Sequence, residues 1–124
     1  MQKDRFEALV VKALDALPAE FRTRLDNVDV MVEDWPTPKQ LREARVRTRI
    51  QLLGLYEGIP QTNRGSGYNL VLPDKITIFQ KPIERVCRDD REIQAEVQKV
   101  VCHEIAHHFG IGDDVLRMIE GKGS

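Results

Sequence analysis

The chain has 124 residues, of which 41% are hydrophobic and 31% charged, and its formal net charge at pH 7 is -1. This composition is typical of a globular protein and excludes collagen-like, low-complexity and disordered chains. The near-zero charge gives no overall field that would attract nucleic acid or an anionic membrane. We therefore expect one domain over residues 1–124.

The cysteines and the start of the chain indicate the compartment. Cys87 and Cys102 are too few for a disulfide framework and form no Cys-x-x-Cys pair, so we expect reduced, mostly buried thiols. The sequence shows no recognisable export signal and no run of about 18 apolar residues. These features predict a cytoplasmic protein with no membrane partner.

Hydrophobic spacing predicts the first elements. Between residues 6 and 17, apolar side chains recur with the i, i+3, i+4, i+7 spacing of one helical face, and Pro18 ends the run. A helical turn is expected at residues 20–25. In residues 28–32 valines alternate with other residues, which predicts a strand with one buried face.

The middle of the chain is less regular. Residues 39–49 carry five cations and a single anion, and we interpret them as a solvated, partly helical face because no aromatic side chain is interleaved. Residues 52–67 are rich in Gly, Pro, Asn and Ser, which predicts a long loop with room for one short extended piece. Residues 70–72 and 75–79 flank a Pro-Asp turn and predict a hairpin or a paired edge.

The last part of the chain is predicted to be helical. Residues 91–109 are apolar on two sides, which indicates a buried helix. Gly110 and Gly112 can adopt the left-handed conformation that ends it. Residues 113–119 begin with two acidic residues and predict a short final helix.

The long helix carries a group of residues suited to metal chemistry. His103 and His107 are four residues apart, so their imidazoles lie on the same side of the helix and can bind one Zn²⁺. Glu104 is adjacent to this pair, where its carboxylate can accept a proton from a water that the metal activates without itself binding the metal. The His-Glu-x-x-His pattern therefore predicts a zinc cofactor and Glu104 as the catalytic base.

A third ligand is needed, because a catalytic zinc takes three protein groups and keeps one position open. Gly110, three residues after His107, can end the helix and turn the chain back. Asp113 follows three residues later and is the predicted third ligand. Asp114 is the alternative, and the carboxylate that does not bind the metal is expected to cap the last helix.

Other residues near the motif have less specific expectations. His108 points about 100° away from His107, which favours a packing or surface role. Tyr56 or Tyr68 could donate to an oxyanion, although packing is the more common role of such a tyrosine. Met118 is expected to pack in the core.

At these residues the chain resembles the small bacterial zincin-like metallopeptidases, or minimal zincins, whose signature is His-Glu-x-x-His-x-x-Gly-x-x-Asp. The resemblance extends to four further segments, residues 6–18, 27–33, 53–58 and 72–79. It implies an α+β fold in which a small mixed sheet packs on the active-site helix, with helices at both ends of the chain. It also implies Glu104 as general base and zinc on His103, His107 and Asp113. It implies no particular substrate.

Three functions fit these observations. The leading one is a zinc-dependent peptidase, whose peptide or protein substrate would add as an extended strand to a sheet edge expected at residues 75–79. The second is a non-catalytic, zinc-stabilised binding or regulatory module.

The third is a metal-dependent endoribonuclease. Small bacterial endoribonucleases of ribosomal RNA maturation carry three metal ligands at the same offsets, and the basic residues 39–49 could hold phosphates. Glu104 argues against it, because those proteins resemble His-Gly-x-x-His at this point, and so does the near-neutral charge. A nucleic-acid partner is therefore not expected.

Overall fold

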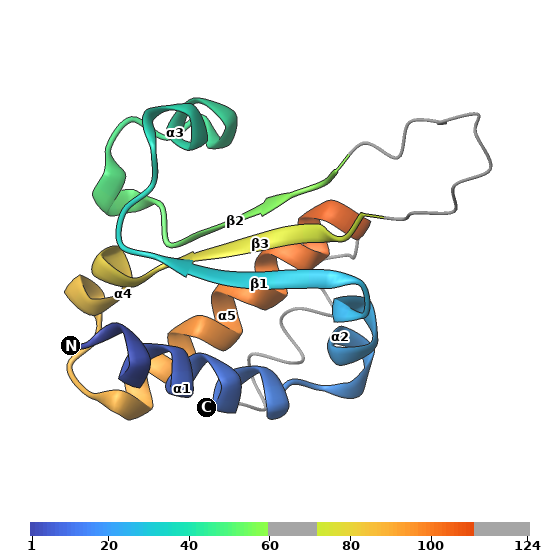
Figure 1. Ribbon diagram of the computed structural model, residues 1–124, viewed down its shortest axis with the longest axis horizontal. Coiled ribbons are helices and arrows are strands. Elements are labelled where there is room, and N and C mark those ends of the chain that lie inside the picture. Colours follow the sequence, from blue (N-terminus) through green and yellow to red (C-terminus); the bar gives the residue numbers. More distant parts are fainter. Residues whose placement is uncertain (60–71, 111–124) are drawn as a thin grey trace.

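The computed structural model describes residues 1–59 and 72–110 (Figure 1). In chain order its elements are α1 (Lys3–Asp15), α2 (Ala19–Arg22), the 3-10 turn η1 (Thr23–Leu25), β1 (Val28–Glu33), α3 (Pro38–Ala44), the 3-10 turn η2 (Arg49–Gln51), β2 (Gly54–Glu57), β3 (Asp74–Phe79), α4 (Gln80–Val86) and α5 (Asp90–Phe109).

The three strands form one mixed sheet in the order β1-β3-β2. The central strand β3 runs parallel to β1, with Val28 opposite Asp74, and antiparallel to β2, with Tyr56 opposite Ile76. Each of the two outer strands therefore has one edge that no described strand pairs with.

The prediction for residues 70–79 was partly wrong. Residues 70–71 lie outside the described part of the chain, and residues 72–73 belong to no strand. Residues 75–79 are not an edge, because β3 has a partner on each side. The partners come from distant parts of the chain, and local sequence signals for a turn do not report such pairings.

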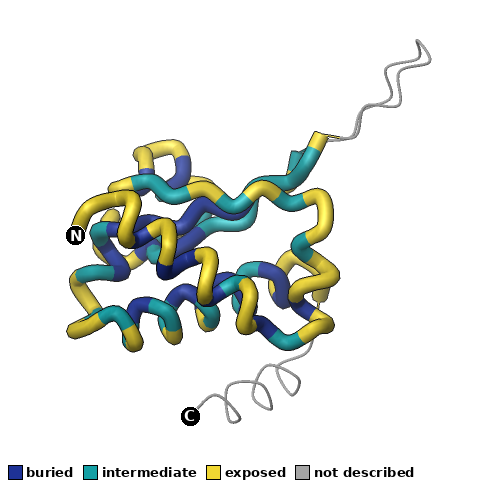
Figure 2. The backbone as a smooth tube through the Cα atoms, turned by 60° about the horizontal axis from the view of Figure 1, so that its bottom comes forward, coloured by how far each residue is buried: buried dark blue, intermediate teal, exposed yellow. Residues whose placement is uncertain are grey.

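The core lies between the sheet and two helices. α1 packs on α5, and α5 packs on β2 and β3. Ile76 and Ile78 of β3 are fully buried in this layer together with Phe6 of α1 and Val97 of α5. Figure 2 shows the buried stretches lying along the inner sides of these elements. α5 is thus held by apolar contacts along most of its length.

The two long helices and the first strand occur where the sequence predicts them. α1 corresponds to the predicted helix 6–17, α5 to 91–109, and β1 to 28–32, with valines half-buried and the residues between them exposed as far as Met31. No described helix is long and apolar enough to cross a membrane. The final helix predicted at 113–119 lies outside the described residues.

One helix was not predicted. α4 follows β3 directly and carries Pro82 in its first turn, where a missing N–H does no harm. Gln80, Pro82 and Ile83 are its buried residues. The helix and strand content agrees with the α+β class that the resemblance implies.

Candidate active site

The C-terminal half of α5 carries the predicted zinc ligands. α5 is a continuous helix of 20 residues, so His103 and His107 lie one turn apart on the same side. Their ring centroids are 6.2 Å apart and their planes are inclined by 77°. His103 is half-buried and His107 is exposed. The two imidazoles are therefore neighbours that solvent can reach.

The helix ends at Gly110, which has the left-handed φ of 68° that its position predicts. The residues that follow lie outside the described part of the chain, including Asp113, Asp114 and Met118; so does Tyr68. Within residues 1–59 and 72–110, no group of three or more His, Cys, Asp or Glu side chains is arranged to hold a metal. The third ligand therefore stays a prediction.

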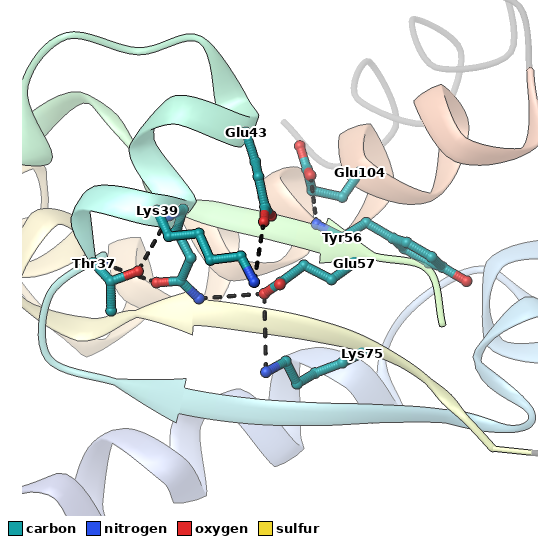
Figure 3. Close-up of polar contacts among 8 residues, drawn as sticks. Thr37, Lys39, Glu43, Tyr56, Glu57, Lys75 and Glu104 are labelled. Atoms are coloured by element: carbon teal, nitrogen blue, oxygen red, sulfur yellow. Dashed lines mark hydrogen bonds and ion pairs between the residues drawn. The ribbon is translucent and has the colours of Figure 1, made fainter. Parts of the chain in front are cut away.

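Glu104 is fixed by the backbone of the neighbouring strand. Its Oε1 accepts a hydrogen bond of 2.8 Å from the backbone N–H of Tyr56 in β2 (Figure 3). Burial raises the pKa of the Glu104 carboxyl, and the Tyr56 N–H and the nearby histidines partly oppose this rise. Its Oε2 accepts no hydrogen bond from the described residues. The carboxylate thus has one oxygen held and one available.

A second cluster adjoins the motif. The Tyr56 hydroxyl donates a hydrogen bond of 2.6 Å to Oδ2 of Asp74, and Oδ1 of Asp74 accepts one of 2.9 Å from the Ile59 N–H. The Tyr56 ring stacks on the His108 imidazole, with centroids 4.0 Å apart and planes inclined by 18°. His108 has the packing role that its helix position predicts.

The same contacts decide the role of Tyr56. Burial, and then the bond to Asp74, raise the pKa of the Tyr56 hydroxyl, while that bond lowers the pKa of Asp74. The phenolic proton is already committed to Asp74, so the structure supports the packing role of Tyr56 rather than donation to an oxyanion. Asp74 was not singled out from the sequence, because nothing local to it indicates a partner 18 residues away.

A groove of about 360 Å³ ends at the motif. One wall is the segment that leads into β2 and the other is a face of α5. The lining residues are Gln51, Leu52, Leu53, Gly54, Glu96, Lys99, Val100, His103 and Glu104. The groove brings two of the predicted site residues, His103 and Glu104, to one opening.

The thiols take no part in this site. Neither cysteine is in a disulfide; Cys102 is buried and Cys87 half-buried, as expected. Burial and the carboxylates of Glu96, Glu92 and Asp89 raise the pKa of Cys87 to about 11. Cys87 is therefore protonated at neutral pH and a poor metal ligand or nucleophile.

Comparison with known proteins identifies the family to which the chain belongs. The family model of the zincin-like metallopeptidases matches residues 25–122 of the 124-residue chain. The chain therefore belongs to the zincin-like metallopeptidase family. The matched range contains the His-Glu-x-x-His motif and Asp113. A search of curated proteins gives no match.

Proposed function

We propose that the protein is a zinc-dependent peptidase that binds the ion through His103, His107 and Asp113 and uses Glu104 as general base. The observation that carries the proposal is the setting of Glu104. It lies half-buried beside two imidazoles, with one carboxylate oxygen held by β2 and the other available. A carboxylate of the helix that merely stabilised the fold would need no such neighbours.

The side chains suit zinc. Two imidazoles and one carboxylate are a nitrogen and oxygen set that this borderline ion accepts. Zn–N bonds of about 2.0–2.1 Å put a ring centroid roughly 3.2 Å from the ion, so two ligands at a tetrahedral angle have centroids about 5 Å apart. The His103 and His107 centroids are 6.2 Å apart, so the two side chains would turn toward each other to share one ion.

Glu104 supplies the proton transfers. When bound, zinc polarises the substrate carbonyl and makes water a stronger nucleophile at neutral pH. Glu104 Oε2 takes a proton from the attacking water and later gives it to the leaving amine. The Tyr56 N–H keeps the carboxylate from rotating away between these two transfers. Glu104 therefore acts first as base and then as acid, and the mechanism requires no further acid.

A peptide or protein is the proposed substrate. β2 is an edge strand that packs on α5 beside Glu104. Its Tyr56 N–H is bound to Glu104, so an extended chain that pairs with the other outward groups of β2 would pass the site. The groove at the start of β2 offers room for a side chain next to His103 and Glu104. β2 takes the role for which residues 75–79 were expected.

The decisive experiment replaces Glu104 by glutamine, which keeps the shape of the side chain and removes its basicity. We expect the zinc-loaded E104Q variant to fold and bind zinc like the parent and to lose about 10²-fold or more of kcat against a peptide library. Glu43→Gln, on exposed α3, is the matched control and should keep parental activity. Equal cleavage by parent and E104Q would contradict the role of Glu104.

Zinc binding, peptide cleavage and RNA cleavage by the parent distinguish the other two functions. A parent that binds zinc and cleaves no peptide would favour the non-catalytic module. Cleavage of RNA would favour the endoribonuclease, but Arg49 of the basic segment stacks on Trp35, 4.2 Å from the ring centroid, within its own chain. This contact leaves the segment less suited to holding phosphates.

A further inference from the structure

β2 lies along α5 in a fixed register. Gly54 lies against Val100, Tyr56 against Glu104, and Gly58, just after the strand, against His108. The steps are two residues on the strand and four on the helix. Two strand residues advance about 6.6–6.8 Å and four helix residues about 6.0 Å, so the two periods nearly match. Contacts of this kind can therefore recur along the pair.

Of the two outer contacts of this register, the one at residue 54 requires glycine and the one at residue 58 favours it. A Cβ atom at residue 54 would collide with Cγ1 of Val100 and lie 3.3 Å from the Thr77 carbonyl oxygen. A Cβ at residue 58 would lie 3.3 Å from Cε1 of His108, which is tight but not a collision. The backbone of β2 thus approaches α5 more closely than a side chain at residue 54 allows.

The central contact, between Tyr56 and Glu104, is the one that involves a predicted site residue. The Phe79 N–H donates to the Leu53 carbonyl, so Leu53 and Phe79 are a hydrogen-bonded pair of the antiparallel ladder. Such pairs alternate along a strand. The N–H groups of Leu55 and Glu57 therefore point toward β3, and that of Tyr56 points away from it. The outward N–H of Tyr56 is the group that binds Glu104. Its distance from the carboxylate depends on how closely β2 approaches the helix.

We propose that Gly54 and Gly58 are positioning residues for Glu104: by letting β2 rest directly on α5, they bring the Tyr56 N–H to Oε1 and leave Oε2 free for proton transfer. The inference rests on the proposed role of Glu104 as base. It assigns a function to two glycines in a segment whose composition predicts a loop with one short extended piece.

The test uses the collision at residue 54 and its removal. Gly54→Ala should move β2 outward and lengthen the Tyr56–Glu104 bond. Val100→Ala removes Cγ1, the atom with which the new methyl group would collide, so G54A should do little in the V100A background. Gly58→Ala, with its milder contact, should have a smaller effect than G54A.

Amide hydrogen exchange in the metal-free protein gives a readout that does not depend on activity. We expect G54A to raise the exchange rate of the Tyr56 amide about ten-fold or more, while the amides of Leu55 and Glu57 change much less because they bond to β3. Glu104→Ala should raise the Tyr56 rate similarly. The G54A/V100A double variant should exchange at Tyr56 as V100A alone does.

In the zinc-loaded enzyme, G54A should lower kcat about ten-fold or more with KM nearly unchanged, and the double variant should match V100A. An unchanged Tyr56 rate in E104A, or a G54A defect that V100A does not relieve, would overturn the proposal. If G54A does not fold, G58A carries the test, and a Tyr56 exchange rate in G58A equal to that of the parent would overturn the proposal. A parent without peptidase activity contradicts the proposed function alone, because the exchange result stands by itself.

Discussion

The two faces of α5 are stabilised in different ways. On one face, Ile93, Val97 and Ile105 are buried in the core, so the packing extends into both halves of the helix. On the face that carries the motif, His103 and Glu104 are only half-buried, and the Glu104 carboxylate is held by the backbone of β2. One face provides stability, and the other exposes reactive groups at a fixed place.

This difference shows how a small protein can hold a polar site. Half-buried imidazoles and a carboxylate add little apolar burial. The buried face of the same helix supplies the packing, and Gln98 binds the middle of the helix to α1 through a hydrogen bond of 3.0 Å to the Ala13 carbonyl. The two functions should therefore be separable by mutation.

The largest effect on stability without an effect on zinc binding is expected from Ile93→Ala. Ile93 is 3% exposed, so the substitution should cost about 3 kcal/mol of unfolding free energy through lost burial and a cavity. Zinc affinity of the folded protein should stay within a factor of about two, because no ligand moves. Urea unfolding of the metal-free protein and a competitive zinc titration measure the two quantities. Strong loss of zinc affinity in the folded variant would show that the two faces are coupled.

The converse effect is expected from Asp113→Ala. Loss of the predicted third ligand should weaken zinc binding about ten-fold or more, roughly 1.4 kcal/mol or more, with little change in the stability of the metal-free protein. Asp114→Ala is the matched control and should bind zinc like the parent. The reverse pattern would identify Asp114 as the ligand.

The sequence predicts the buried face of α5 better than the contacts of the face that carries the motif, for a physical reason. Periodic burial of residues such as Ile93 and Val97 is visible in a single segment. The histidine spacing is visible as well, because one helix sets it. The bond from Tyr56 to Glu104 spans 48 positions and the bond from Tyr56 to Asp74 spans 18, and each depends on how the strands pair. For the same reason β2, and not residues 75–79, was found to be the edge beside the helix.

A smaller effect is expected at the start of α5. Asp89→Ala removes the side-chain acceptor of the Glu92 N–H, and such a cap contributes about 1 kcal/mol. The cost should appear in urea unfolding and leave zinc affinity and kcat unchanged. Asp89→Asn, which can still accept, is the control and should recover most of the stability. A change in kcat would mean that fraying at Asp89 reaches the site some four turns away.

The smallest effect on stability is expected at Asp74, which accepts hydrogen bonds from Tyr56 and Ile59. The sign of its pH dependence follows from its lowered pKa. The bonds from Tyr56 and Ile59 lower the pKa of Asp74 in the folded protein, so the ionised carboxylate stabilises the fold. This contribution is fully present above the ordinary aspartate pKa of about 3.9 and is lost as the pH falls through the lower folded value.

Asp74→Asn should therefore reduce unfolding free energy by about 0.5–1 kcal/mol near pH 7, since the side chain is partly exposed and asparagine can still accept one bond. The deficit should shrink as the pH falls below about 3.9 toward pH 3, because the carboxylate of the unfolded parent then becomes protonated before that of the folded parent. Tyr56→Phe, which removes the hydroxyl donor and keeps the ring, should reduce the same pH dependence. Urea midpoints of the metal-free proteins at the two pH values measure this effect. A deficit that grows as the pH falls would exclude an ionised Asp74 as the group that stabilises Tyr56 and the Ile59 amide.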